Sequence, residues 1–292
     1  MRLSDDMQAH LASGVTTLCR AWAVTRVDGT QLGFTDHDGD LTFDGIVFRA
    51  DTGLTALALQ QGTGLSVDNT EAMGALSDGA ITEADVNAGR YDGAEVRCWL
   101  VNWADVAQRA LQFRGSIGEL RRTGGAFEAE LLGLTDQLNR PMGRVYQRPC
   151  AAVLGDGVCR KDLTEAGYQA EVVVTGIEAN VLWFETVPGF DDSWFQRGVL
   201  EVLTGEAAGL KGMIKQDVQG ASGREITLWS VLGAQVAVGD SVRLTAGCDK
   251  RMETCRFKFN NLANFQGFPD IPGNDWTVAI PASATATGGS RR

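Results

Sequence analysis

The sequence predicts a mainly β protein that consists of an N-terminal β-barrel-like domain, a second small β domain and a C-terminal cysteine-rich coil. Hydrophobic and polar residues alternate with a period of two over about eight short segments of the first half, and over several more of the second half. The chain also has 36 glycines without a repeat, which indicates many tight turns. Short strands joined by such turns are typical of antiparallel barrels and sandwiches.

The length of 292 residues allows about two domains of roughly 150 residues each. Hydrophobic residues make up 44% of the chain and charged residues 22%, which is ordinary for a soluble globular protein and excludes disorder of the whole chain. We expect a β-barrel-like domain over 1–145, a second β domain over 146–247, a cysteine motif with an aromatic coil over 248–281, and a flexible tail over 282–292.

The first domain is expected to open with an amphipathic helix within 3–18, because its apolar residues recur at spacings of four and three. Asp28-Gly29 and Asp44-Gly45 predict hairpin turns. Thr82 is expected to cap a short helix over 78–86, and 135–141 is typical of one helical turn closed by a proline. The expected strands are 19–27, 32–35, 41–43, 46–48, 65–67, 94–101, 111–120 and 127–134.

A second β-rich block begins near Ala170, after a domain boundary within 141–150. Its expected strands are 171–177, 181–186, 199–203, 213–218, 226–229 and 242–244. Regular alternation stops after Gly247. Residues 257–281 are rich in aromatic side chains among Asn, Gly and Pro, which predicts an ordered coil packed on another part of the protein.

The charge balance and the histidine count restrict the function classes. A net charge of −11 argues against a protein that wraps nucleic acid, although DNA could pass such a surface without adhering to it. Only two histidines, His10 and His37, are present, so a cluster of imidazole ligands is excluded. No apolar run approaches the length of a membrane span, and no secretory signal opens the sequence, so we expect the protein to be made and to fold in the cytoplasm.

Four of the six cysteines flank the second β block. Eight residues separate Cys150 from Cys159 before the block, and six separate Cys248 from Cys255 after it. Four thiolates that converge on one point can hold Zn²⁺ or an iron–sulfur cluster. Structural zinc usually has gaps of about two to four residues within a pair, whereas wider gaps suit the larger cubane cluster.

Other interpretations of these cysteines stay open at the level of sequence. The alternatives are buried free thiols and disulfides. Disulfides are less favoured, because the compartment is reducing. Neighbouring cations favour thiolates, because positive charge lowers the pKa of a thiol; they are Arg160, Lys161, Lys250, Arg251 and Arg256. Cys19 and Cys98 lie in apolar strand patterns and are expected in the core.

Other candidate sites favour structural interpretations. The run 36–40 lacks the glycine and glutamate of a calcium-binding EF-hand, because Leu41 and Val47 occupy those positions, so a hairpin turn with solvated carboxylates is expected. Neither a Gly-x-Ser-x-Gly elbow nor a phosphate-binding glycine loop occurs. The aromatic pairs 183–184 and 194–195 could line a sugar groove, but core or interface packing is the preferred interpretation.

Two longer segments resemble known proteins. Residues 247–269, GCDKRMETCRFKFNNLANFQGFP, resemble the C-terminal cysteine motif of lambda-type minor tail proteins. Residues 34–45, FTDHDGDLTFDG, are similar to the N-terminal signature of tail-hub proteins from alphaproteobacterial prophages and gene transfer agents. The two motifs occur in the same order as in those proteins, and the resemblance covers about residues 5–275.

The resemblance implies a structural, non-enzymatic hub protein at the tail tip, or baseplate, of a phage-like virion. It implies a [4Fe–4S] cluster held by Cys150, Cys159, Cys248 and Cys255. It further implies a homo-oligomeric ring, a trimer, that joins the tail tube and distal tail protein to a central tip or fibre protein, with DNA passing through the lumen without specific binding. The alternatives are a tail-associated cell-wall hydrolase and a binding module stabilised by zinc.

Overall fold

A computed structural model describes residues 3–50, 69–72, 81–123, 126–133, 143, 145–220 and 223–271. The expected strand 65–67, the helical turn 135–141 and the tail 282–292 lie outside these residues. The chain divides into two compact units. The first comprises Met1–Met142 with the segments Glu206–Leu210 and Leu232–Val236, and the second comprises the rest of the chain. The predicted mainly β fold is confirmed in both units.

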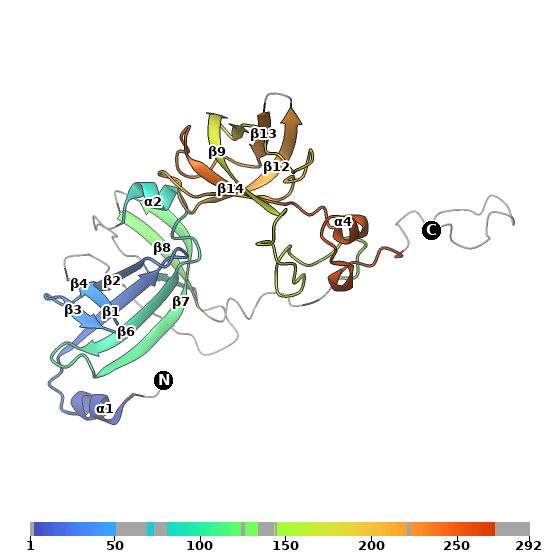
Figure 1. Ribbon diagram of the computed structural model, residues 1–292. Coiled ribbons are helices and arrows are strands. Elements are labelled where there is room, and N and C mark those ends of the chain that lie inside the picture. The colour runs from blue at the N-terminus through green and yellow to red at the C-terminus, as the bar shows by residue number, and fades with distance from the viewer. Residues whose placement is uncertain are drawn as a thin grey trace. The chain divides into compact units, whose positions relative to one another are not determined.

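The first unit is built on one eight-stranded sheet in the order β3-β4-β2-β1-β6-β7-β8-β5 (Figure 1). Neighbouring strands are antiparallel except β2 and β4, which run parallel. The strands are β1 (Leu18–Thr25), β2 (Gln31–Thr35), β3 (Leu41–Phe43), β4 (Ile46–Arg49), β5 (Asn69–Ala72), β6 (Glu95–Asn102), β7 (Arg109–Thr123) and β8 (Ala126–Gly133).

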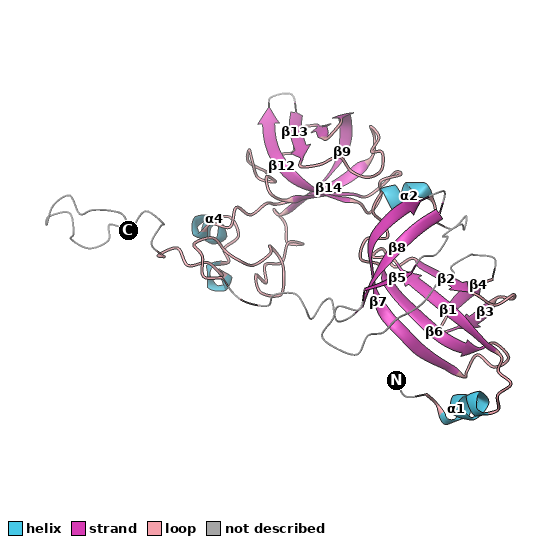
Figure 2. Ribbon diagram, turned by 180° about the vertical axis from the view of Figure 1, so that it is seen from behind, coloured by secondary structure: helices cyan, strands magenta, loops and turns pink. Residues whose placement is uncertain are grey.

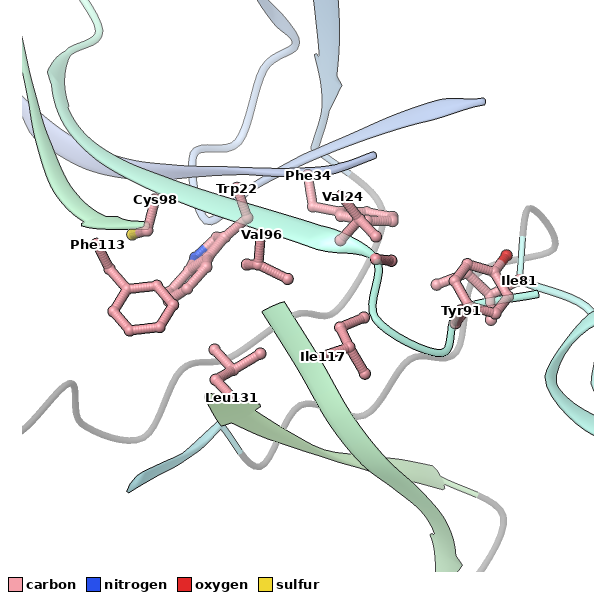
Figure 3. Packing of buried hydrophobic residues seen from close by; sticks show 11 residues of the cluster. Trp22, Val24, Phe34, Ile81, Tyr91, Val96, Cys98, Phe113, Ile117 and Leu131 are labelled. Carbon is pink, nitrogen blue, oxygen red and sulfur yellow. The ribbon is translucent and has the colours of Figure 1, made fainter. Parts of the chain in front are cut away.

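The central strand β1 is buried on both faces, so each face of the sheet carries its own core. Trp22 and Val24 point into one cluster, together with Phe34 and Phe113 (Figure 3). The alternate residues of β1 pack into a second cluster, in which two stacked phenylalanine rings meet the edge of Trp99. Because successive side chains of a strand point to opposite faces, a run of small and large apolar residues fills both clusters.

The two helices that the structure describes in this unit begin at capping side chains. Ser4 caps α1 (Asp5–Ala12) by accepting from the amide of Met7, and Thr82 caps α2 (Glu83–Asn87) by accepting from the amide of Asp85. The predicted cap at Thr82 is thereby confirmed. The first helix is shorter than the expected range 3–18, since Gly14 adopts a left-handed conformation at φ 72° and Leu18 already belongs to β1.

The second unit contains a closed six-stranded barrel in the order β10-β13-β12-β11-β14-β9 (Figure 2). Inward-facing residues alternate with outward ones along each strand, as in Leu200 and Val202 of β11. Its strands are β9 (Gln169–Glu178), β10 (Val181–Phe184), β11 (Val199–Val202), β12 (Lys211–Gly220), β13 (Gly223–Leu228) and β14 (Ser241–Thr245). Two short helical segments follow the barrel, α4 (Met252–Phe257) and η1 (Leu262–Asn264).

A buried ion pair fixes a long loop to this barrel. The guanidinium of Arg224 binds both carboxylate oxygens of Asp217, at 2.6 and 2.7 Å, and both side chains are fully buried. Arg224 also donates to the carbonyl of Asp191, and Asp217 accepts from the amide of Phe195. The charges are thus fully hydrogen-bonded, which is the condition under which a buried ion pair is tolerated.

Candidate metal centre

The barrel brings its two ends together. β9 and β14 pair antiparallel, so that Gln169, where the barrel begins, lies opposite Thr245, where it ends. The amide of Ala246 continues this ladder by donating to the carbonyl of Tyr168 at 2.8 Å. The segment before β9 and the segment after β14 therefore leave the barrel side by side, and these are the segments that carry the four cysteines.

All four predicted ligands line one cavity. The sulfur-bearing residues Cys150, Cys159, Cys248 and Cys255 share it with the apolar side chains of Leu154 and Phe259 and with polar neighbours such as Asn261. Cys159 and Cys255 are buried, whereas the other two are half-buried. All six cysteines of the chain are free thiols, so the disulfide alternative is not adopted here, and Cys19 and Cys98 lie in the core of the first unit as predicted.

The loop that carries the first pair is organised by Asp156. Its carboxylate accepts from three backbone amides, those of Val153, Val158 and Cys159, at 2.6–2.9 Å. These hydrogen bonds hold the pKa of Asp156 below its ordinary value, with the bond from Cys159 as the largest cause. The backbone of Cys159 is thus held by hydrogen bonds within its own loop, independently of contacts with the segment after the barrel.

Lys250 joins one cysteine of each segment. Its carbonyl accepts from the amide of Cys150 at 2.8 Å, and its own amide donates to the sulfur of Cys248 at 3.4 Å. Its ammonium group donates to the carbonyl of Ala152. Lys250 adopts a left-handed conformation at φ 68°, which turns both its amide and its carbonyl toward the cysteine loops.

Asn261 joins the other two cysteines. Its side-chain amide donates to the carbonyl of Cys159 at 2.7 Å and reaches the sulfur of Cys159 at 3.5 Å. Its backbone amide donates to the carbonyl of Cys255 at 2.9 Å, and its carbonyl accepts from the Cys255 thiol at 3.3 Å. The quartet is thus held as two pairs, each made of one cysteine before the barrel and one after it.

Hydrogen bonds from N–H groups reach three of the four sulfurs. Besides the bonds from Lys250 and Asn261, the backbone amide of Gln266 donates to the sulfur of Cys150 at 3.4 Å. N–H donors directed at sulfur stabilise thiolates, and such donors recur around the ligands of iron–sulfur clusters. The arrangement is therefore suited to sulfurs that carry negative charge.

As free thiols, the two cysteines of the later segment are protonated at neutral pH. Burial, as the largest cause, and interaction with the other three thiols together raise the pKa of Cys255 to about 11. Burial also raises the pKa of Cys248, although Lys250 acts in the opposite direction. The expected effect of a nearby cation is therefore present at Cys248, where burial outweighs it.

Two of the cations named from the sequence are engaged elsewhere. Lys161 binds Glu165 at 2.5 Å and lies over the ring of Tyr168, and Arg256 lies over the ring of Phe257. Only Lys250 and Arg251 line the cavity. Less positive charge therefore surrounds the sulfurs than the cations next to the cysteines in the sequence suggested.

Among the described residues, no group of three or more His, Cys, Asp or Glu side chains could hold one metal ion. Tetrahedral zinc bound at about 2.3 Å would bring its sulfurs to about 3.8 Å from one another. A cubane cluster spaces its cysteine ligands farther apart. Four thiols with N–H groups directed at three of the sulfurs form a donor set of the type found around iron–sulfur clusters.

The segment after α4 is packed against the barrel and against the first cysteine loop. Lys258 donates to the carbonyls of Trp194 and Gly247 at 2.5 and 2.9 Å, and burial lowers its pKa to about 8. Farther along, the ring of Phe268 meets Tyr146, and a side chain at Gly267 would collide with the carbonyl of Arg148. The predicted ordered, packed coil is confirmed as far as residue 271, the last one described.

The remaining candidates have structural contacts. The imidazole of His10 accepts from the amide of Thr17, and that of His37 accepts from the amide of Gly39. Phe184 and Phe195 are buried in the barrel, in keeping with core packing. In the described part of the chain, no helix is long and apolar enough to cross a membrane.

Comparison with known proteins gives matches over nearly the whole chain. A family described as "Baseplate hub protein, N-terminal attachment domain" matches residues 4–162. A second family, "Phage conserved hypothetical protein BR0599", matches residues 193–275. No curated protein matches the chain.

One solved structure is similar throughout its length. A chain of the "Virion of native gene transfer agent (GTA) particle" is 57% identical, with a TM-score of 0.89, over 98% of this chain and 99% of that one. The matches confirm the predicted location, the baseplate of a virion tail, and the predicted resemblance to tail-hub proteins. The chain belongs to the baseplate hub protein family.

Proposed function

We propose that the protein is a structural hub of the tail baseplate in a phage-like particle, and that a [4Fe–4S] cluster held by Cys150, Cys159, Cys248 and Cys255 stabilises it. The observation that carries the cluster is the convergence of four thiols, drawn from both ends of the barrel, on one cavity. The family supports the structural part of the proposal, and the donor set supports the cluster.

The chain's own residues explain what such a site does for the fold. The backbone of Lys250 and the side chain of Asn261 already connect the two cysteine segments by hydrogen bonds. When bound, a cluster supplies covalent iron–thiolate bonds to both segments, so that its binding free energy becomes folding free energy. The role is thus mechanical: it fastens the entry and exit of the barrel together.

The proposed partners follow from a hub's position. We infer a closed ring of identical copies, a trimer, with heterologous contacts between neighbours. One side of the ring would meet the distal tail protein and the tail tube, and the other a central tip or fibre protein. The net charge of −11 suits a lumen through which DNA passes without binding.

Anaerobic purification of the full chain tests the cluster. We expect about four irons and four acid-labile sulfides per chain, a broad visible absorbance of brown iron–sulfur proteins and no stoichiometric zinc. One zinc per chain without sulfide would contradict the cluster and would show that the four cysteines hold a zinc ion. Absence of both metals, in protein never exposed to air, would contradict a metal centre.

The ring is tested separately from the metal. Light scattering of the purified chain, alone and mixed with a distal tail protein of the same particle, should give the mass of three copies in at least one of the two samples. Filter binding of double-stranded DNA should give no retention at moderate salt. A monomer in both samples would contradict the ring, whatever the iron content.

A further inference from the structure

Asn261 contacts both cysteines of one pair at four points. The side chain reaches the carbonyl and the sulfur of Cys159, and the backbone exchanges two hydrogen bonds with Cys255. Asn261 is buried, with 9% of its surface exposed. Asn261 is 102 residues from Cys159 in the sequence but only six residues from Cys255, so its contacts join two distant segments.

The orientation of its amide is fixed by a neighbour. Asn264 donates from its own side-chain amide to the Oδ1 atom of Asn261 at 2.8 Å. Because Oδ1 accepts this bond, the Nδ2 atom must be the one that faces Cys159. Asn264 also lines the cysteine cavity, so the chain of donors runs from the cavity wall to the sulfur.

We propose that Asn261 is a positioning residue of the cluster site: it holds Cys159 and Cys255 in register across the two segments and donates an N–H to the Cys159 sulfur. The inference rests on the proposed cluster, and it assigns a role to a residue that is not itself a ligand. A neutral amide suits this role, because it supplies a donor without adding charge beside four thiolates.

An aspartate at this position would reverse the contact. Asn261→Asp keeps the size and the oxygen that accepts from Asn264, but replaces the N–H donor by a carboxylate that faces a thiolate and a carbonyl. The matched control is Asn260→Asp. Asn260 is the exposed neighbour of Asn261, and its φ of 47° suits aspartate as well as asparagine. The Asn260→Asp substitution changes the net charge by the same amount as Asn261→Asp.

The experiment compares the full-length variants with the wild type after anaerobic cluster assembly. Two quantities are measured: the rate of iron loss to a chelator, and the midpoint potential of the cluster by dithionite titration with electron paramagnetic resonance. Asn261→Asp should lose iron about 10-fold or more faster. Its potential should fall, because a donor to sulfur is removed and a negative charge is added. Asn260→Asp should match the wild type.

The possible results separate this inference from the proposed cluster. A wild-type chain without iron and sulfide would overturn the cluster and this role together. A loaded wild type with an Asn261→Asp variant of equal loss rate and equal potential would overturn the role of Asn261 alone. If Asn261→Asp does not fold, Asn264→Ala removes only the orienting donor; a smaller shift in the same direction supports the role, and wild-type values overturn it.

Discussion

Gln169 lies opposite Thr245 across the β9–β14 ladder, so the first and last residues of the barrel are neighbours. The two cysteine segments are therefore close in space although they are far apart in the sequence. The barrel places Gln169 and Thr245, which are 76 residues apart in sequence, at adjacent strand ends, and the two segments need only short loops to meet. The predictions below test what this adjacency does for stability and assembly.

Loss of one sulfur should loosen the segment behind the barrel. Cys248→Ser is expected to lose most of its iron, to increase protease cleavage and amide exchange after residue 247, and to lower the yield of particles. Barrel peptides should exchange as in the wild type. Cys19→Ser, a change in the core of the other unit, should keep the iron. Normal particle yield with unchanged proteolysis of Cys248→Ser would contradict a fastening role.

The cysteine loop should depend on one carboxylate. Asp156→Ala leaves three backbone amides without their acceptor, so the amide of Cys159 should exchange with solvent faster, as followed by hydrogen exchange. Asp162→Ala is the control, because Asp162 accepts only from Thr164. Equal exchange of the Cys159 amide in both variants would contradict the assignment.

The same loop should respond to acid in a defined direction. The pKa of Asp156 is lower in the folded chain than its ordinary value of 3.8. Its contribution to stability is therefore complete above that value and disappears as the pH falls through the lower, folded pKa. Amide protection at Cys159 should persist down to pH 4 and then decrease. Asp156→Ala should lack this step.

Lys258 should make the junction with the barrel more stable in mild alkali. Its pKa is about 8 in the folded chain and 10.5 ordinarily, because burial disfavours the charge. Between these values the unfolded chain binds more protons, so the free energy of unfolding rises with pH. Urea titrations below, within and above this interval should reveal a rise that Lys258→Met lacks and Lys215→Met retains. Parallel curves for all three proteins would contradict the shift.

The buried ion pair should be essential for the barrel. Asp217→Ala leaves the Arg224 guanidinium buried and unpaired, and should lower the free energy of unfolding by about 3–5 kcal/mol. Glu201→Ala removes partly exposed pairs with Lys211 and Arg243 on the same barrel and should cost no more than about 1 kcal/mol. Urea unfolding followed by amide exchange of barrel peptides measures both. Similar costs would argue against a special role for the buried pair.

Most strands could be predicted, because burial on one or two faces imposes a period of two. β1 is an example, since Trp22 and Val24 on one face alternate with small residues on the other. Strand order is a different matter. The alternation of apolar and polar residues does not show which strands pair with each other. Among the described strands, those of the second β block close into a barrel, whereas those of the first block form a sheet with β3 and β5 at its edges.

The cysteine quartet could be predicted from its position on both sides of the β block, and its surroundings could not. Asn261 follows another asparagine in a segment without periodicity, so no pattern distinguishes the buried residue from its exposed neighbour. Its contact with Cys159 depends on barrel closure. The raised pKa of Cys248 was missed for a related reason: burial, which cannot be read from the sequence, outweighs the charge of Lys250.

The adjacency of the barrel's first and last strands also determines how it bears tension. A pull that separates residues 143–168 from residues 246–271 would act on the end of the β9–β14 ladder and peel its hydrogen bonds apart in succession, beginning with the pair Gln169–Thr245. Peeling of this kind needs little force, because one bond is loaded at a time. A cross-link beyond the strand ends takes up that load before it reaches the ladder. The proposed cluster would be such a cross-link, and with it the barrel would stay closed while the hub is under tension.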